Sequence, residues 1–277
     1  MTYGSILVPI DEHPSAAGSI EAAIRLAGAL GAHLEGLAIV PPLAVPLRLR
    51  PRQSAAAIMK KEWERDKQEA RAGIKRFEAQ ARKAGVASVE GLSVEAEAQA
   101  ILSLRARTAD LVVLPLPGED DTGILGGHSI EAAILSVGRP VLLVPEKGLP
   151  AGFPRKALVA WNGSRESARA LSDAVPLLAR AKSVLVFSAG PAGDEGPLHG
   201  ARSAVRYLAR HGITAEPLHA TAADERVGDT ILARAKKAGA DVVVMGAYGR
   251  PRFAELVLGG ATRAVLRSAG VAVLMSH

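Results

Sequence analysis

The residues with the clearest chemical potential are glycines near the end of the sequence. The apolar run Val242–Met245 is followed by Gly246-Ala247-Tyr248-Gly249 and, nine residues later, by Gly259-Gly260-Ala261. Glycine lets a backbone approach a ligand closely, and the free N–H groups at a helix start attract phosphate. Two glycines in a loop usually mark only a turn. Placed between a buried strand and an apolar helix, this spacing predicts a phosphate-binding loop.

Two other groups of residues could take part in catalysis, but their arrangement gives little support for it. Asp11-Glu12-His13 could form an acid–base cluster, and His128-Ser129 could pair a base with a nucleophile. Adjacent His and Ser side chains rarely face each other, and Ser129 is a ready helix N-cap. The seven histidines lack metal-ligand spacing, and no Gly-x4-Gly-Lys-Ser/Thr loop is present. We expect no metal site and no catalytic residue, although weak ATPase activity stays open.

Composition sets the class of protein that must position these residues. The 277 residues are 48% hydrophobic and 22% charged, and cysteine is absent. Disulfide frameworks, thiolate metal sites and cysteine nucleophiles are therefore excluded. The apolar runs are far shorter than a membrane span, and the first residues do not resemble a signal peptide. These features predict a cytoplasmic protein with no membrane contact.

The basic character of the chain is confined to one segment. Between Arg48 and Lys83 there are 12 Lys/Arg and 5 Asp/Glu, whereas the whole chain carries a net charge of +6. Aromatic residues make up 3% and do not interleave with this run, so no nucleic-acid partner is expected. Apolar residues recur at helical spacing over Met59–Ala81. We expect one helix there, with its lysines in water in preference to an anion-binding face.

The sequence also contains an internal repeat. Three segments recur: Ser5–Asp11 as Lys156–Asn162 at an offset of 151, Ala109–Leu114 as Ala240–Met245, and Ser136–Leu143 as Ser268–Met275 at an offset of 132. The offset falls by 19, so the first half should hold an insertion, and the basic segment is the obvious place for it.

Each half alternates short apolar runs with amphipathic helical stretches. The strand candidates are Ser5–Ile10, His33–Val40, Val86–Val94, Asp110–Leu114 and Pro140–Val144, then Ala157–Trp161, Ser183–Ser188, Ile213–His219, Asp241–Met245 and Val271–Met275. Apolar runs joined by helices predict parallel strands covered on both faces. The expected fold class is α/β, with two tandem doubly wound five-stranded sheets. The domains would be residues 1–147 and 153–277, joined at Pro145–Pro154.

These motifs resemble the universal stress protein family. The Gly-x2-Gly-x9-Gly loop is similar to that family's nucleotide loop, and Ile6–Asp11 and Val271–Met275 resemble its first and last strands. Ser164-Arg165-Glu166 resembles the start of its first helix. The resemblance covers nearly the whole chain. It implies flavodoxin-like or Rossmann-like halves of the adenine nucleotide α-hydrolase type, packed together as the family's homodimers pack.

The resemblance also implies where a ligand would lie. Members that bind ATP use an Asp after the first strand for the adenosine end and the glycine loop for ribose and phosphates. In the second half, the implied contacts are Ala160, Trp161, Asn162, Gly246, Gly249, Gly259, Gly260 and Ala261. Asn162 replaces the Asp, and Gly260 stands where Ser or Thr is expected. Arg250 and Arg252 could add charge to the loop.

The first half departs further from the family pattern. Its implied residues are Ile10, Asp11 and Gly127. At an offset of 132, Leu114 would replace Gly246 and Pro117 would replace Gly249. Because proline lacks an N–H donor and fixes φ, this half is expected to bind phosphate poorly.

The expected function is that of a non-catalytic stress-response protein able to hold ATP or another adenine nucleotide in its second half. The alternative is a structural module that binds no nucleotide and acts through dimerisation or protein docking. The two halves should form an intramolecular pseudo-dimer, and a homodimer is left open. An ATP-hydrolysing enzyme is the least favoured reading, since no base or metal carboxylate pair accompanies the loop.

Overall fold

The computed structural model describes residues 2–43, 53–118, 127–190, 196–221, 226–249 and 260–277. The first half contains β1 (Ser5–Pro9), α1 (Pro14–Leu30), β2 (His33–Val40), α2 (Gln53–Lys83), β3 (Val89–Glu95), α3 (Ala98–Ala106), β4 (Leu111–Pro115), α4 (Gly127–Ser136) and β5 (Val141–Val144). The second half contains β6 (Lys156–Ala160), α5 (Arg165–Asp173), α6 (Val175–Leu178), β7 (Ser183–Gly190), α7 (Gly196–Arg210), β8 (Ala215–Thr221), α8 (Val227–Ala238), β9 (Val242–Gly246), α9 (Gly260–Ser268) and β10 (Ala272–Ser276).

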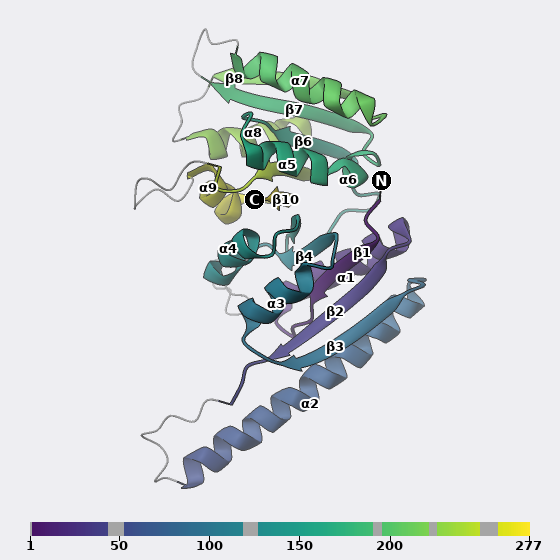
Figure 1. The fold of residues 1–277 in the computed structure, drawn as a ribbon, viewed down its shortest axis with the longest axis vertical. Coiled ribbons are helices and arrows are strands. Elements are labelled where there is room, and N and C mark those ends of the chain that lie inside the picture. Colours follow the sequence, from purple (N-terminus) through teal and green to yellow (C-terminus); the bar gives the residue numbers. More distant parts are fainter. Residues whose placement is uncertain (1, 44–52, 119–126, 191–195, 222–225, 250–259) are drawn as a thin grey trace.

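All strands belong to one ten-stranded sheet, in the order β3-β2-β1-β4-β5-β10-β9-β6-β7-β8 (Figure 1). Strands pair in parallel within each half, whereas β5 and β10 pair antiparallel with Leu142 opposite Leu274. The last strands of the two halves therefore meet at a pseudo-twofold axis, and the two expected five-stranded sheets are joined into one. The doubly wound α/β class is confirmed. Within it, each half has the strand order 3-2-1-4-5, which is the Rossmann variant and differs from the 2-1-3-4-5 order of flavodoxin.

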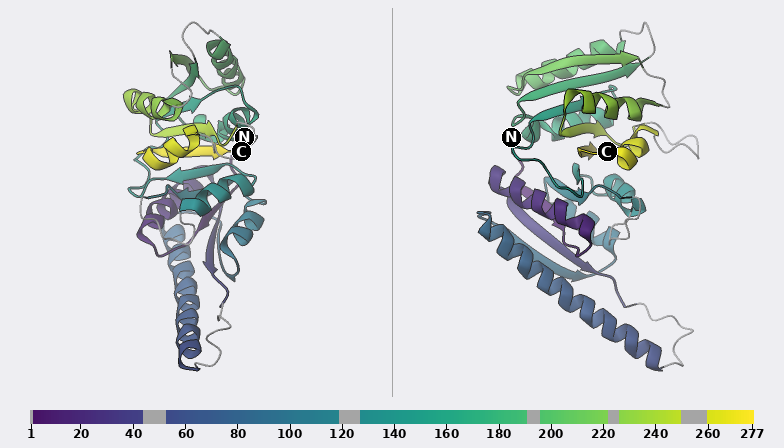
Figure 2. Two further views of the ribbon diagram at one scale, coloured as in Figure 1. Left: turned by 90° about the vertical axis from the view of Figure 1, so that its left-hand side faces the viewer. Right: turned by 180° about the vertical axis from the view of Figure 1, so that it is seen from behind.

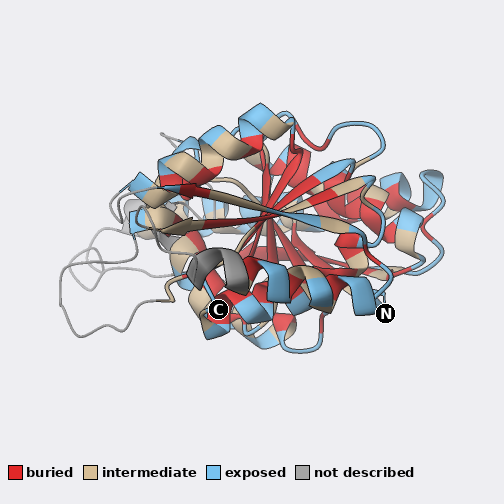
Figure 3. Ribbon diagram, turned by 90° about the horizontal axis from the view of Figure 1, so that it is seen from above, coloured by how far each residue is buried: buried red, intermediate tan, exposed pale blue. Residues whose placement is uncertain are grey.

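Helices cover the sheet on both faces (Figures 2 and 3). One buried cluster joins the sheet to α1, α2, α5, α6 and α7, and the other joins it to α3, α4, α8 and α9. Neighbouring strand residues such as Val112 and Val113 lie in opposite clusters and are both fully buried. Burial on both faces explains why these strands read as continuous apolar runs.

Helix ends follow local sequence signals. Pro14 begins α1, where its missing N–H costs nothing, and the His13 side chain accepts a hydrogen bond from the Ser15 N–H. Gly31 ends this helix with φ 66°, a left-handed conformation that favours glycine. Ser164 is the N-cap of α5 and accepts from the Ser167 N–H at 3.1 Å. This cap fixes where α5 starts beside the candidate site.

The insertion lies between β2 and the middle of α2. Strand pairing relates β2 to β7 at an offset of 150, since His33 and Ser183 have matching partners. The ends of α2 and α7 are related at an offset of 127, because the Val86 N–H donates to the Ala81 carbonyl just as the Ile213 N–H donates to the Leu208 carbonyl. The first half is therefore 23 residues longer there, within the basic segment that the repeat indicated.

The helix α2 packs on the sheet only along its second part. Ile74, Phe77 and Ala81 are buried against the first half, whereas the earlier turns project past the end of β3 (Figures 1 and 2). Trp63 Nε1 donates to the Pro41 carbonyl at 3.0 Å, and Lys67 Nζ lies 4.0 Å from the centre of the Trp63 ring. Lysines of the outer face are exposed, including Lys60 and Lys61. The expected exposure of these lysines is confirmed.

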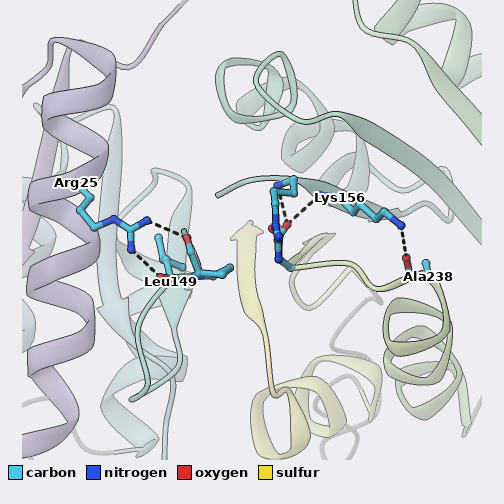
Figure 4. A network of polar contacts seen from close by, with 7 residues as sticks. Arg25, Leu149, Lys156 and Ala238 are labelled. Atoms are coloured by element: carbon cyan, nitrogen blue, oxygen red, sulfur yellow. Dashed lines mark hydrogen bonds and ion pairs between the residues drawn. The ribbon is translucent and has the colours of Figure 1, made fainter. Parts of the chain in front are cut away.

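The connection between the halves is held by hydrogen bonds between its backbone and side chains of both halves. Arg25 of α1 donates to the carbonyls of Leu149 and Pro150 at 2.7 and 2.9 Å (Figure 4). On the other side, the Asp241 carboxylate accepts from the N–H groups of Arg155 and Lys156, and Lys156 Nζ reaches the Ala238 carbonyl at 3.4 Å. The connection thus packs at the strand-start edge of the second half, away from the carboxyl ends of β6 and β9.

Candidate functional site

The candidate site lies where β6 and β9 end side by side. These neighbouring parallel strands pair from Ala157 with Val242 to Ala160 with Met245. The chain leaves β6 into α5 on one face of the sheet and leaves β9 towards α9 on the other. Such a divergence is the switch point at which doubly wound sheets bind ligands. The topology therefore brings the end of β6 and the glycine loop after β9 to one place.

Strand pairing corrects the expected match between the two halves. Ile6 pairs with Leu111, and its equivalent Ala157 pairs with Val242, so β4 and β9 are related at an offset of 131. The Asp110 carboxylate caps the Gly4 N–H at 2.8 Å, just as Asp241 caps Arg155 at 2.8 Å. Gly246 therefore corresponds to Pro115 and not to Leu114.

The same register shows that the first half keeps a second loop glycine besides Gly127. At an offset of 131, Gly249 corresponds to Gly118 and not to Pro117. The offset returns to 132 at β5 and β10, so the second-half loop is one residue longer. A single offset was wrong because this extra residue lies between the strand and the helix. The first-half loop departs through Pro115 and its shorter length.

The polar residue after the first strand of each half forms a hydrogen bond to the backbone two residues later. Asn162 Oδ1 accepts from the Ser164 N–H at 3.0 Å, and Asp11 Oδ1 accepts from the His13 N–H at 3.0 Å. Asn162 is exposed at the carboxyl edge. Its oxygen caps the turn, so its NH2 group is the part of the side chain not used in that bond. Such a group donates hydrogen bonds only.

The two residues before Asn162 point to opposite faces of the sheet. Ala160 packs on the cluster that includes α9, whereas Trp161 packs on the cluster that includes α7. Trp161 Nε1 is buried without a hydrogen-bond partner among the described residues. A Cβ added to Gly200 of α7 would lie 3.1 Å from this nitrogen. Trp161 thus packs under α7, as its first-half counterpart Ile10 packs near Gly73 of α2.

The loop after β9 has little room for side chains. A Cβ on Gly246 would lie 2.5 Å from the Glu166 carbonyl carbon and 2.5 Å from the Ser167 nitrogen. Tyr248 adopts φ 56°, an uncommon conformation for a non-glycine residue, and its N–H donates to Thr262 Oγ1 at 3.3 Å. The first glycine is therefore required by the close approach of α5.

At the start of α9 the backbone is open. Gly260 is exposed, and an added Cβ there would meet nothing within 4 Å. Ala261 is half-buried and Thr262 is buried. Gly259, Arg250 and Arg252 lie outside the described residues, and Gly127 is the first residue of α4. The first turn of α9 thus offers accessible backbone beside the loop.

A buried carboxylate in this site was missed by the sequence reasoning. Glu166 of α5 is 8% exposed, and its Oε2 would lie 2.8 Å from a Cβ on Gly249. A hydrogen bond from its own backbone N–H and one from the Ser164 hydroxyl lower its pKa, with the charge of Arg165 adding to the effect. Burial opposes this shift. An acidic residue in the first turn after an N-cap Ser was the available signal.

Comparison with known proteins places the chain in a family. The model of the Universal stress protein family matches residues 2–145 and again residues 154–277. The chain belongs to the universal stress protein family. A search of curated proteins gave no significant match. The two matches correspond to the two halves of the ten-stranded sheet.

Solved structures with the same fold include other universal stress proteins. The chain is similar to one from Archaeoglobus fulgidus (TM-score 0.73, 15% identity, 99% of this chain and 98% of that one). It is also similar to a putative one from Pseudomonas aeruginosa (TM-score 0.62, 20% identity, 99% and 93%). A shorter universal stress protein solved in complex with cAMP matches 45% of this chain and 97% of its own, with 24% identity and a TM-score of 0.38.

Two further features of this universal stress protein concern metal ions and membranes. The described segments hold no group of three or more His, Cys, Asp or Glu side chains that could bind a metal ion. None of the helices in those segments is long and apolar enough to span a bilayer.

The glycine loop is also linked to the other half of the protein. Arg263 Nε of α9 and Glu131 Oε1 of α4 lie 3.9 Å apart, and both charges act on the Tyr248 hydroxyl. Burial and then the Glu131 charge raise the pKa of Tyr248 to about 12, and Arg263 opposes this shift. Tyr248 of the loop therefore lies near a contact between the two halves.

This shift predicts an alkaline dependence of stability. Below the unfolded pKa of about 10, the contribution of neutral Tyr248 is fully present, and it is lost as the pH rises towards about 12. We expect Tyr248→Phe to flatten the fall in unfolding free energy between about pH 9 and about pH 11. Urea denaturation at both pH values measures this. Equal slopes for the wild type and the variant would contradict the assignment.

Proposed function

We propose that this universal stress protein is a non-catalytic stress-response protein that holds an adenine nucleotide in its second half. The supporting observation is the meeting of exposed Asn162, the Gly246–Gly249 loop and exposed Gly260 at the switch point between β6 and β9. Asn162 would contact the adenosine end. The loop and the first turn of α9 would contact ribose and phosphate through backbone N–H groups.

The second half is proposed as the binding half because its loop is less altered. Pro115 replaces Gly246 in the first half, and the loop there is one residue shorter. Proline removes one N–H donor and fixes φ at that strand end. Asp11 remains in the first half, but its carboxylate repels a phosphate. Ligand should therefore bind against Gly249 and Gly260.

A module that binds no nucleotide is the second candidate. Its supporting observation is α2, whose first turns project beyond the sheet and expose Ile58. Such a helix could contact another protein or a second copy of this chain.

Calorimetric titration with adenosine, AMP, cyclic AMP and ATP tests the proposal. The full chain must first be shown free of co-purified nucleotide. Saturable binding near one site per chain supports a nucleotide-holding protein. Absence of heat with every ligand, together with an equilibrium-dialysis control, supports the interaction module. Measured turnover of ATP would contradict the non-catalytic assignment.

The residue after β6 provides a sharper prediction. We expect Asn162→Asp to tighten adenosine binding by about 1–3 kcal/mol, because the carboxylate keeps one oxygen for the Ser164 N–H and offers the other as a charged acceptor. Calorimetry measures the change.

The matched control reverses this exchange in the other half. Asp11→Asn occupies the equivalent position and should leave adenosine binding unchanged. If Asp11→Asn weakens binding and Asn162→Asp does not alter it, the ligand lies in the first half and the assignment is wrong.

A further inference from the structure

The carboxylate of Glu166 lies in the space that the second loop glycine leaves open. A Cβ on Gly249 would lie 2.8 Å from Glu166 Oε2 and 3.1 Å from Ser164 Oγ. The Glu166 side chain therefore occupies the space that a side chain at position 249 would need. A phosphate that approached Gly249 from the side of its missing Cβ would meet this oxygen first.

The carboxylate is held in place and stays charged. Its own backbone N–H and the Ser164 hydroxyl bond to it and lower the pKa of Glu166. Arg165 is the nearest described cation, with its NH2 3.5 Å from Glu166 Oε1, but that side chain is 97% exposed. Water screens such a partner strongly. The charge facing the loop is thus only weakly compensated by Arg165.

This carboxylate is specific to the second half. The helix starts are related at the offset of 151 that relates β1 to β6, so Ser15 is the counterpart of Glu166. Ser15 Oγ lies 2.8 Å from His13 Nδ1. The second half therefore carries a negative charge at the loop, on Glu166, whereas the first half carries one at the strand end, on Asp11, where the second half has Asn162.

Resting on the proposed function, we infer that Glu166 makes the second-half site select adenosine, or a nucleotide with a single phosphate charge, over ATP. Like charges repel, and the Glu166 side chain is only 10% exposed, so water screens it little against the several negative charges that a triphosphate brings to the loop. Displacing the carboxylate would break its bonds to the helix start. Uncharged adenosine keeps the contacts at Asn162 and avoids this repulsion.

Titration of the full chain with adenosine and ATP, in buffer with a metal chelator, tests the inference. Glu166→Gln keeps the shape and an acceptor for the N–H group while removing the charge. We expect ATP to bind the variant at least about tenfold tighter than the wild type, and adenosine to change by less than about twofold. Glu21→Gln, an exposed residue of α1, is the control with the same change in net charge.

The outcomes separate the two proposals. Adenosine binding with an ATP affinity that Glu166→Gln does not alter overturns the selectivity and leaves nucleotide binding intact. An equal gain for adenosine and ATP also overturns it. If neither ligand binds any variant, nucleotide binding itself fails. Circular dichroism checks folding, and Glu166→Ala provides a second removal of the charge if the glutamine variant does not fold.

Discussion

Replacing Gly246 with alanine should destabilise the second half strongly. The new Cβ would lie 2.5 Å from two backbone atoms of α5, the Glu166 carbonyl carbon and the Ser167 nitrogen. Backbone cannot move aside as a flexible side chain can, so β9 and α5 must separate. We expect the free energy of unfolding to fall by about 3 kcal/mol. Urea denaturation measures this change.

Gly260 provides the matched control for this substitution. Alanine at Gly260 meets nothing within 4 Å, and the residue begins a helix, so its stability should change by less than about 1 kcal/mol. Both positions belong to the same loop motif. Equal effects of the two substitutions would show that the contact between α5 and Gly246 is not what requires a glycine there.

This contact changes how the glycine motif is understood. From the sequence, each glycine had the same role, which was to let a ligand approach the backbone. In the structure, Gly246 accommodates the α5 backbone, Gly249 accommodates a glutamate side chain, and Gly260 faces open space. A motif spacing cannot separate these roles, because all three require only the absence of a side chain. The helix that approaches the loop lies about 80 residues away in the sequence.

Much of the fold could be predicted because the chain repeats itself. Strands buried on both faces appear as apolar runs in both halves, so each run supports the other. The outer strands β3 and β8 were placed too early, at Val86 and Ile213. These buried residues close the preceding helices through bonds to Ala81 and Leu208, and the strands begin later. An apolar residue that closes a helix looks the same in sequence as one that opens a strand.

The register of the loops was harder to predict for a related reason. A one-residue difference between Gly118 and α4 is invisible when a repeat is aligned from both ends with one offset. The repeat of Ala109–Leu114 as Ala240–Met245 already has an offset of 131, one less than the offset at the last strands, and the strand partners of Leu111 and Val242 confirm it. Which residues occupy the candidate site depends on that register, because a slip of one position exchanges Pro115 for Leu114. Side-chain contacts such as that of Glu166 depend on it as well.

The seam between the halves should be the most sensitive part of the sheet. Leu274 of β10 is 0% exposed and lies opposite Leu142 of β5, at the centre of the only antiparallel pairing among the described strands. Aspartate at Leu274 would remove apolar burial and place a carboxylate among apolar side chains. We expect the free energy of unfolding to fall by about 4 kcal/mol or more.

The effect is large because a charged side chain at the seam cannot reach water. Both neighbours of β10 are paired strands, and helices cover both faces, so water cannot reach position 274 without separating the halves. Leu104→Asp, the same change on a side chain that is 56% exposed, should cost less than about 0.5 kcal/mol. Thermal and urea unfolding of the three proteins measure the difference. If Leu274→Asp unfolds with the wild-type midpoint, the β5–β10 pairing does not join the halves in solution.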